Sequence, residues 1–391
     1  MDSELQGLLV GLPIAFTLGF ALGWLGSRLD LRQQRRDPAY ASRAYLRGLN
    51  LLLNEQHDRA IDAFIEAIQK DPETADLHFA LGNLFRRRGE VERAVRVHEH
   101  LLQRADLPRA ERDRAQHALA EDFMQAGLFD RAEKAWLALE GSAFTTDAQL
   151  ALLALYERSR QWAEASATAR RLEQIGLGSF AVRLAHHRCE EASEADARGD
   201  GAAADAALVE ARRLAPQAPR PMAEIGHRAA RRGDPAAAVA AWNELLALNP
   251  SAFNLVAVDY AREAAAAGQQ AEGFTRLLEA WRRDPGLDLL TALEALDADP
   301  NRRAARLQQH LREHPTLGAA LLRLRNAERA GQAQALEPTD ARDLADAIDR
   351  AGRPLRRYRC AACAFEANQY FWQCPGCLGW DTLPPRRMEE S

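Results

Sequence analysis

The chain has 391 residues, of which 47% are hydrophobic and 7% aromatic, and its formal net charge is −5 at pH 7. Such a length exceeds what one hydrophobic core usually serves, so about two or three domains are expected. Abundant alanine, leucine, arginine and glutamate favour helix throughout. A nucleic-acid-binding domain would be strongly basic, so the charge gives no reason to expect a nucleic-acid partner.

The first element is an uncharged segment from Leu5 to Ser27. A helix of that length rises ~34 Å at ~1.5 Å per residue, which is enough to cross a bilayer core. A cleaved signal peptide would need a basic start, and this chain begins with acidic residues instead. Arginines between residues 28 and 36 follow the segment, which places the body of the protein in the cytoplasm. Residues 1–28 are therefore predicted to be a retained, single-pass transmembrane anchor.

The middle of the chain, residues 29–352, carries an internal repeat. Gly48 matches Gly82 and Ala60 matches Ala94, each pair separated by 34 residues. This is the tetratricopeptide period, in which small residues let the two helices of a unit and successive units pack closely. The sequence therefore predicts an all-α fold, a tetratricopeptide-type helical solenoid of about seven to nine helix pairs.

The repeat signature continues along the chain beyond the second unit. Further units are marked by Ala132 with Trp136, Ala165 with Ala169, Ala204 with Ala211, Ala238 with Trp242, and Leu277 with Ala280. A degenerate unit is expected up to Pro315, followed by a closing helix or two up to about residue 350. The motifs RRGE, QAGLFD, RRGD and AAGQ stand where the turn inside a unit belongs, with glycine at the helix end.

A solenoid of this kind presents a long concave surface that usually binds protein segments. In the second unit, Asn83, Arg86 and Arg87 fall on the inner side of the first helix, where they could hold a peptide backbone or a carboxylate. The alternative is a solvated polar face, because exposed arginines need no functional explanation. These three residues are the candidate peptide-binding site.

The last segment, residues 353–391, contains two C-x2-C motifs separated by ten residues: Cys360 with Cys363, and Cys374 with Cys377. Two such knuckles supply four thiolates to one tetrahedral metal ion. Four cysteine ligands close the coordination sphere, so the site is expected to be structural and not catalytic. Zinc and iron both accept this ligand set, and the spacing does not separate them. Paired redox cysteines are a weaker alternative, since the context of a thioredoxin-like fold is absent.

The sequence has no G-x-S-x-G, no H-E-x-x-H, no Walker loop and no dinucleotide-binding fingerprint, so an enzyme is not expected. Cys189 stands alone in a helical stretch and is predicted to be a small buried residue. His98 is predicted to be a core histidine. The aromatic residues around the knuckles are expected to stabilise a small domain, and some could form a docking face on the repeats.

The order of these parts resembles the lipopolysaccharide assembly protein B family. The resemblance spans the whole chain and is carried by LGNLFRRRGEVERAVRVHEHLL (Leu81 to Leu102), AGLFDRAE, LREHPT, and RYRCAACAF with FWQCPGC. It implies a rubredoxin-like metal domain with one iron ion on Cys360, Cys363, Cys374 and Cys377, with zinc as the alternative. A glycine usually follows each C-x2-C of a rubredoxin, and Ala364 and Leu378 stand there instead.

The resemblance also implies a function. A family member would be an adaptor at the cell inner membrane that regulates lipopolysaccharide synthesis. It would present the LpxC deacetylase to the FtsH protease and gather other inner-membrane lipopolysaccharide proteins. A rubredoxin-type electron-transfer protein and a general assembly scaffold without a protease link are the alternatives, and a homo-oligomer is left open.

Overall fold

The computed structural model describes residues 38–70, 73–329, 345–346 and 348–390. The predicted transmembrane anchor, residues 1–28, lies outside these described residues. Within them, no helix combines the length and the apolar character needed to cross a membrane. The chain divides into two compact units, Met1–Leu155 and Tyr156–Ser391.

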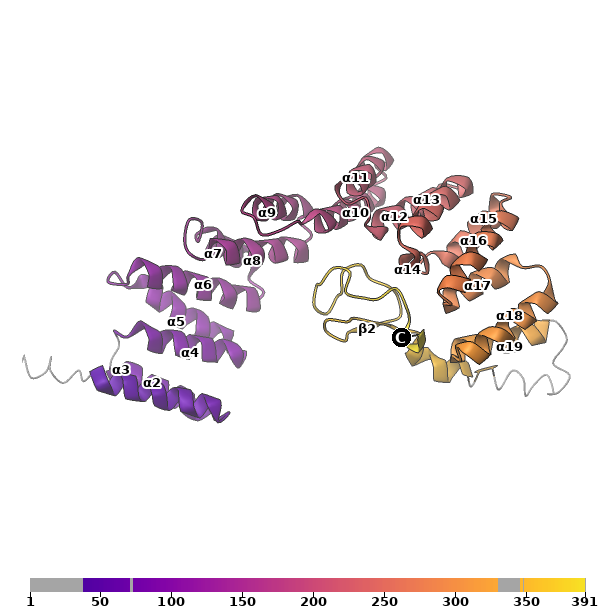
Figure 1. Ribbon diagram of the computed structural model, residues 1–391. Coiled ribbons are helices and arrows are strands. Elements are labelled where there is room, and N and C mark those ends of the chain that lie inside the picture. Colours follow the sequence, from indigo (N-terminus) through magenta and orange to yellow (C-terminus); the bar gives the residue numbers. More distant parts are fainter. Residues whose placement is uncertain (1–37, 71–72, 330–344, 347, 391) are drawn as a thin grey trace, which may run out of the picture. The chain divides into compact units, whose positions relative to one another are not determined.

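The first unit is a succession of helices, and consecutive helices between Pro38 and Leu137 pack on one another (Figure 1). Its helices are α2 (Pro38–Leu53), α3 (His57–Lys70), α4 (Ala75–Arg87), α5 (Val91–Gln103), α6 (Arg109–Gln125), α7 (Phe129–Leu137) and most of α8 (Thr145–Arg158).

The second unit continues the helical pairs and ends in the small cysteine-rich domain. Its helices are α9 (Trp162–Gln174), α10 (Ala181–Ala197), α11 (Gly201–Leu214), α12 (Pro219–Arg231), α13 (Pro235–Leu248), α14 (Pro250–Phe253), α15 (Ala257–Ala266), α16 (Gln270–Arg283), α17 (Leu287–Leu296), α18 (Pro300–Glu313) and α19 (Leu317–Arg329). The cysteine-rich domain contains the 3-10 turns η1 (Arg353–Arg356) and η2 (Met388–Glu390) and the antiparallel strands β1 (Tyr358–Arg359) and β2 (Glu366–Ala367).

A glycine in the first helix of a pair lets a ring from the second helix lie against the backbone. A Cβ atom at Gly82 would overlap the ring of His98, and one at Gly226 would overlap the indole of Trp242. The ring follows its glycine by the same interval in both pairs, since 98 − 82 = 16 and 242 − 226 = 16. This close approach is the physical reason for the small-residue positions in the repeat signature.

Turns inside the pairs have the expected glycine at the end of the first helix. Gly89, Gly127, Gly199, Gly233 and Gly268 all have positive φ angles. These glycines lie in the turn motifs identified in the sequence or in turns of the same pattern. Glycine has no side chain, so it adopts a positive φ angle without strain. In the turn between α8 and α9 the same conformation is taken by Arg160, with a φ of 59°.

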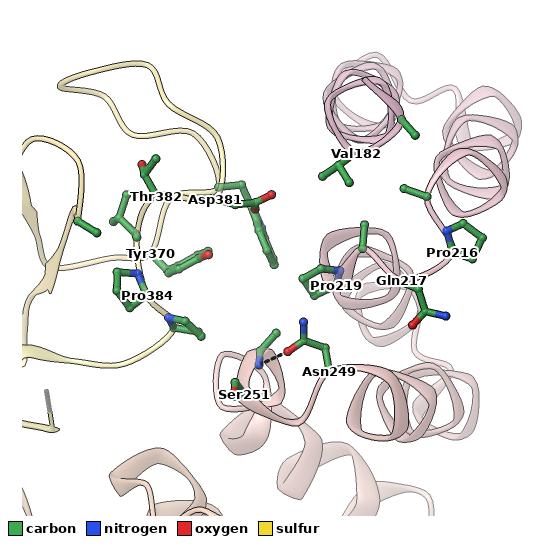
Figure 2. Close-up of a pocket in the computed structure, with 18 of the residues that line it drawn as sticks. Val182, Pro216, Gln217, Pro219, Asn249, Ser251, Tyr370, Asp381, Thr382 and Pro384 are labelled. Carbon is green, nitrogen blue, oxygen red and sulfur yellow. Dashed lines mark hydrogen bonds between the residues drawn. The ribbon is translucent and has the colours of Figure 1, made fainter. Parts of the chain in front are cut away.

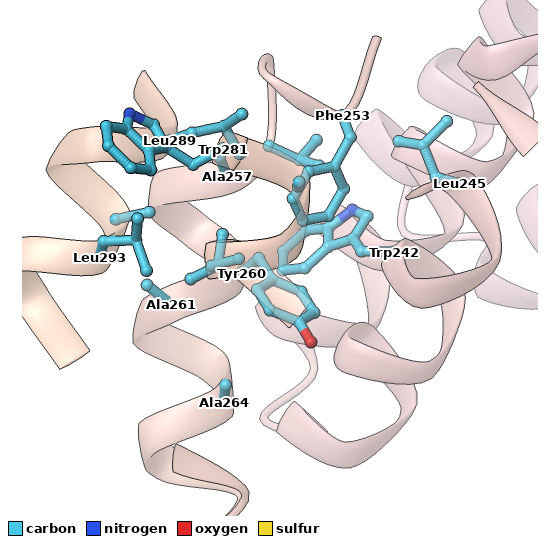
Figure 3. Packing of buried hydrophobic residues seen from close by; sticks show 14 of the residues in the cluster. Trp242, Leu245, Phe253, Ala257, Tyr260, Ala261, Ala264, Trp281, Leu289 and Leu293 are labelled. Carbon is cyan, nitrogen blue, oxygen red and sulfur yellow. The ribbon is translucent and has the colours of Figure 1, made fainter. Parts of the chain in front are cut away.

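The core of the second unit is built around large aromatic side chains. Trp242, Phe253 and Tyr260 are fully buried and lie together between α13, α14 and α15 (Figure 3). The Trp242 indole donates to the carbonyl of Ala223 at 3.3 Å, and the Tyr260 hydroxyl donates to the Asn243 side chain at 2.8 Å. Buried polar tips are thus paired, so these rings contribute apolar burial without an unpaired donor.

The predicted all-α repeat array with a four-cysteine domain at its end is confirmed. The degenerate last pair corresponds to α17 and α18, and α19 is the closing helix; part of the region expected to continue to residue 350 lies outside the described residues. The predicted boundaries at residues 28 and 352 stay predictions, whereas the division after Leu155 was not anticipated from the sequence.

We expect Gly226→Ala to destabilise the second unit, because the added methyl group must displace the Trp242 indole. Overpacking of this kind costs roughly 1–3 kcal/mol, which outweighs the ~1 kcal/mol helix-propensity gain of Ala over Gly. Denaturant unfolding followed by tryptophan fluorescence measures the change. Adding Trp242→Phe to Gly226→Ala makes room for the methyl group and should recover part of the lost free energy of unfolding. An unchanged denaturation midpoint for Gly226→Ala alone would contradict this packing.

Candidate metal centre

The four cysteines at the C-terminal end come together at one point. Their Sγ atoms all lie within 4.8 Å of one another, with Cys360 and Cys377 3.8 Å apart and Cys363 and Cys374 3.7 Å apart. A tetrahedral ion with metal–sulfur bonds of about 2.3 Å requires sulfur–sulfur separations of about 3.8 Å. A disulfide would require about 2.05 Å. The spacing therefore fits one four-coordinate metal ion and not a pair of disulfides.

Both knuckles have the same backbone geometry. The Ala364 N–H donates to the Cys360 carbonyl at 2.9 Å, and the Leu378 N–H donates to the Cys374 carbonyl at 2.8 Å. Each first cysteine also donates its own N–H across the turn, Cys360 to the Phe365 carbonyl at 2.9 Å. These turns hold both sulfurs of a motif on one side, so the two knuckles form equivalent halves of the site.

The missing glycines of the usual rubredoxin pattern do not change the turns. Ala364 and Leu378 have φ angles of 59° and 57°, the left-handed conformation that glycine adopts most readily. Non-glycine residues in that region are strained, so the closed turn is held by its hydrogen bonds and by the ligand set. The chain thus differs from the usual rubredoxin pattern in the residue type at these two positions, while the left-handed backbone conformation of the turns is kept.

The thiols differ in exposure and acidity. Cys360 and Cys374 are buried, whereas Cys363 and Cys377 are exposed. The Thr382 hydroxyl lowers the pKa of the Cys360 thiol to about 6. The Phe365 backbone amide lowers the pKa of Cys363, but desolvation and the other three cysteine sulfurs outweigh it and raise that pKa to about 12. Metal ligation needs all four as thiolates, so binding of an ion releases protons.

A metal on these four thiolates would cross-link the two knuckles of a very small domain. The buried residues of that domain are few: Tyr358, Cys360, Cys374 and Leu383. A core this small does not stabilise a fold of this length by itself, so the ion is a structural element. The same ligand set accepts zinc or iron, and it leaves no open coordination position for a substrate.

The metal domain is docked on the repeats through Trp380. Its ring stacks on the imidazole of His186 in α10, with centroids 4.5 Å apart and planes 16° apart. His186 Nε2 also lies 2.8 Å from a carboxylate oxygen of Asp381. Burial lowers the pKa of His186, although Asp381 acts in the opposite direction. Two consecutive residues of the metal domain, Trp380 and Asp381, thus contact one buried histidine. The predicted aromatic docking face on the repeats is found at Trp380.

The C-terminal tail makes a second set of contacts. A carboxylate oxygen of Glu390 accepts the Leu287 N–H at 2.5 Å, and one of Glu389 accepts the Gly318 N–H at 3.0 Å. These amides belong to the first turns of α17 and α19, where backbone N–H groups lack helical partners and favour negative charge. Arg387 in addition pairs with Asp288 at 2.9 Å. The tail therefore caps two helices of the repeat array.

The sequence predicted an aromatic docking face but not its partners on the repeats, nor the contacts made by Asp381, Glu389 and Glu390. His186 belongs to no recognisable sequence motif, and its partner Asp381 lies 195 residues away. The signal that was available is the GWDT segment directly after the second knuckle, which places an aromatic ring and a carboxylate next to each other. No periodic pattern links that segment to α10.

The candidate peptide-binding residues lie on α4, but Arg86 is already engaged within the first unit. Its guanidinium donates to the Asn83 side chain at 2.7 Å and to Asp122 at 3.1 Å. Asp122 is fully buried and also meets His98 at 2.5 Å, which confirms His98 as a core histidine. Arg87 is exposed. Peptide binding by Asn83, Arg86 and Arg87 stays a prediction, with Arg86 also holding its neighbours in place.

Cys189 has no part in the metal site. Its side chain is 2% exposed and packs among alanines of α10 and α11. Burial raises the pKa of this thiol to about 12, so it stays protonated. The prediction of a small buried residue is confirmed.

We expect Ala364→Gly to stabilise the metal-loaded domain by about 0.5–1 kcal/mol, because glycine removes the strain of a positive φ angle. Ala364 is exposed, so little packing is lost. The measurement is the rate at which a chelator removes the metal, which should fall. A faster loss of metal would contradict the strain assigned to this turn.

We expect His186→Ala to release the metal domain from the repeats, since stacking and a hydrogen bond to a carboxylate are together worth about 2–3 kcal/mol. Limited proteolysis should then cut the segment before the metal domain much faster. His314→Ala, which alters an exposed histidine in the same unit, is the control. Equal protection in both variants would show that the stack does not hold the domain.

Comparison with known proteins agrees with the geometry of the site. A family model described as a rubredoxin metal binding domain matches residues 358–385. The chain is 31% identical over 399 residues to lipopolysaccharide assembly protein B of Escherichia coli strain K12, with 98% of each chain covered. It is 27% identical over 400 residues to the protein of that name from Haemophilus influenzae, with 97% of this chain and 98% of the relative covered.

Among solved structures, a tetratricopeptide repeat protein from Parabacteroides merdae is 14% identical, covering 66% of this chain and 99% of its own. Its TM-score is 0.34, which is too low to carry an argument. The Escherichia coli relative does carry one, because 31% identity along 98% of both chains includes the four-cysteine domain. The chain belongs to the lipopolysaccharide assembly protein B family.

Proposed function

We propose that this protein is a membrane-tethered adaptor that regulates lipopolysaccharide synthesis at the inner membrane. It presents the LpxC deacetylase to the FtsH protease and organises other lipopolysaccharide proteins there. The observation that carries the proposal is the docking of the metal domain on α10, α17 and α19. A metal domain fixed in this way extends the binding surface of the repeats, as an adaptor requires.

Three further features support this function. The relatives that match the whole chain are named for lipopolysaccharide assembly. An uncharged segment followed by arginines precedes the repeats, as in a protein held at a membrane with its body in the cytoplasm. A four-thiolate site has no open coordination position, so it suits a structural role in an adaptor that is not an enzyme.

The ion in the proposed adaptor is iron, with zinc as the alternative. Both fit sulfur–sulfur separations near 3.8 Å. Metal analysis of the protein purified from its native cells decides between them, because ferric iron on four thiolates is coloured and zinc is not.

Electron transfer is the second candidate function, and one observation favours it. Cys363 and Cys377 are exposed, so an iron held by them would lie near the surface, where a redox partner could approach. A reversible one-electron couple together with a redox partner would support this function. A colourless zinc protein from native cells would exclude it.

We expect a chain with Cys374→Ser and Cys377→Ser to lose regulation while it stays in the membrane, because two ligands of the site are removed. Immunoblots of the deacetylase after protein synthesis is stopped should show several-fold slower turnover. Cys189→Ala is the control, since it removes a buried cysteine that is not one of the four clustered ligands. Unchanged turnover in the double variant would contradict a role of the metal domain in the adaptor.

A further inference from the structure

A large cavity lies in the second unit between the metal domain and the repeats (Figure 2). Its volume is about 1060 Å³. One wall carries Val182 of α10 and Pro219 of α12, and the opposite wall carries Tyr370 and Pro384 of the metal domain. Cavities of this size at the junction of two domains, lined mainly by apolar side chains, are the usual form of a binding site.

The lining of this cavity disfavours a charged ligand. None of the described residues that line it is basic, and its one acidic residue, Asp381, is bound to His186. The nearby guanidinium of Arg220 is buried and pairs with Glu190 at 2.7 Å. A phosphate or carboxylate placed in the cavity would find no cation among the described lining residues, and burial of an unpaired charge is strongly unfavourable.

Neutral amide groups at the cavity suit a polypeptide better than a hydrocarbon chain. Asn249 accepts the Ala252 N–H with its Oδ1 atom at 3.0 Å, drawn as a dashed line in Figure 2. Its NH2 group has no hydrogen-bond partner among the described residues. Gln217 offers an exposed amide beside it. A bound peptide presents carbonyl and N–H groups to such amides, whereas an acyl chain leaves them unpaired.

We propose that this cavity binds an uncharged, apolar, extended segment of a client polypeptide. The inference rests on the proposed function, which supplies a client, and it adds where that client is held and what chemistry is recognised. Apolar side chains of the segment lie against Val182, Pro219 and Pro384, and its backbone meets Asn249 and Gln217. Because the metal domain forms one wall, binding depends on the metal through the shape of the cavity.

The full chain in lipid nanodiscs, loaded with metal, is the protein for the test. The probes are fluorescent peptides of roughly ten residues with blocked ends, composed of Leu, Val, Ala and Ser, each with a sibling that carries one central Asp. Fluorescence anisotropy gives the dissociation constants. We expect the uncharged peptides to bind and their Asp siblings to bind at least about tenfold more weakly.

Two variants test the site itself. Val182→Asp places a charge at the mouth of the cavity, where the valine is 48% exposed, and Asn249→Asp keeps the capping oxygen while it removes the NH2 donor. Each should weaken peptide binding at least about tenfold with little change in the unfolding midpoint. Val209→Asp is the matched control, because Val209 is 67% exposed on α11 and does not line the cavity.

The inference would be overturned if the uncharged peptides did not bind, or if they bound equally well to Val182→Asp and Val209→Asp. It would also be overturned if laurate displaced a bound peptide at a lower concentration than the same peptide without its fluorescent label. Laurate as the preferred ligand would mean a lipid site. Deacetylase turnover in cells that carry Val182→Asp separates the two proposals. Normal turnover with this variant, combined with loss of turnover in the cysteine double variant, would refute the cavity as the client site and leave the adaptor function standing.

Discussion

The stack of Trp380 on His186 is the interaction that joins the two kinds of structure in this chain. The repeat array is stabilised by packing of successive helices, and the metal domain by its four-cysteine site. Neither kind of stabilisation requires contact between the two parts. The ring of Trp380 and the carboxylate of Asp381 hold one buried histidine of α10, and the tail caps α17 and α19. Without that docking, the cavity bounded by Val182 and Tyr370 would lack one wall.

In the proposed adaptor the metal acts through this docking, because four thiolates leave no open coordination position for a substrate. Four thiolates fix the two knuckles, the knuckles fix the loop that carries Trp380 and Asp381, and that loop meets α10. The stable fold of a domain with so few buried residues depends on its ion. We therefore expect a change in metal occupancy to change the shape of the repeat surface, which in the proposed adaptor would couple client binding to metal or redox state.

The repeats and the candidate metal ligands could be predicted from the sequence, because both depend on the spacing of residues that are close together in the chain. A glycine or alanine recurs where a ring from the next helix must approach, as with Gly82 and His98, and the four cysteines follow metal-knuckle spacing. Docking could not be predicted in the same way. His186 and Asp381 are separated by 195 residues, and Glu389 acts only because the first turn of α19 lies beside it. The engagement of Arg86 by buried Asp122 was hidden for the same reason.

Hydrogen–deuterium exchange of the full chain, with metal and after its removal by a chelator, tests the central claim most directly. If the metal-dependent domain is docked as described, metal removal will increase exchange in Ala181–Ala197 and Leu287–Leu296 as well as in residues 358–385. Exchange in Ala75–Arg87, which belongs to the other unit, will stay unchanged. An increase in exchange confined to residues 358–385 would contradict the account, because the repeat helices would then not be stabilised by the metal domain.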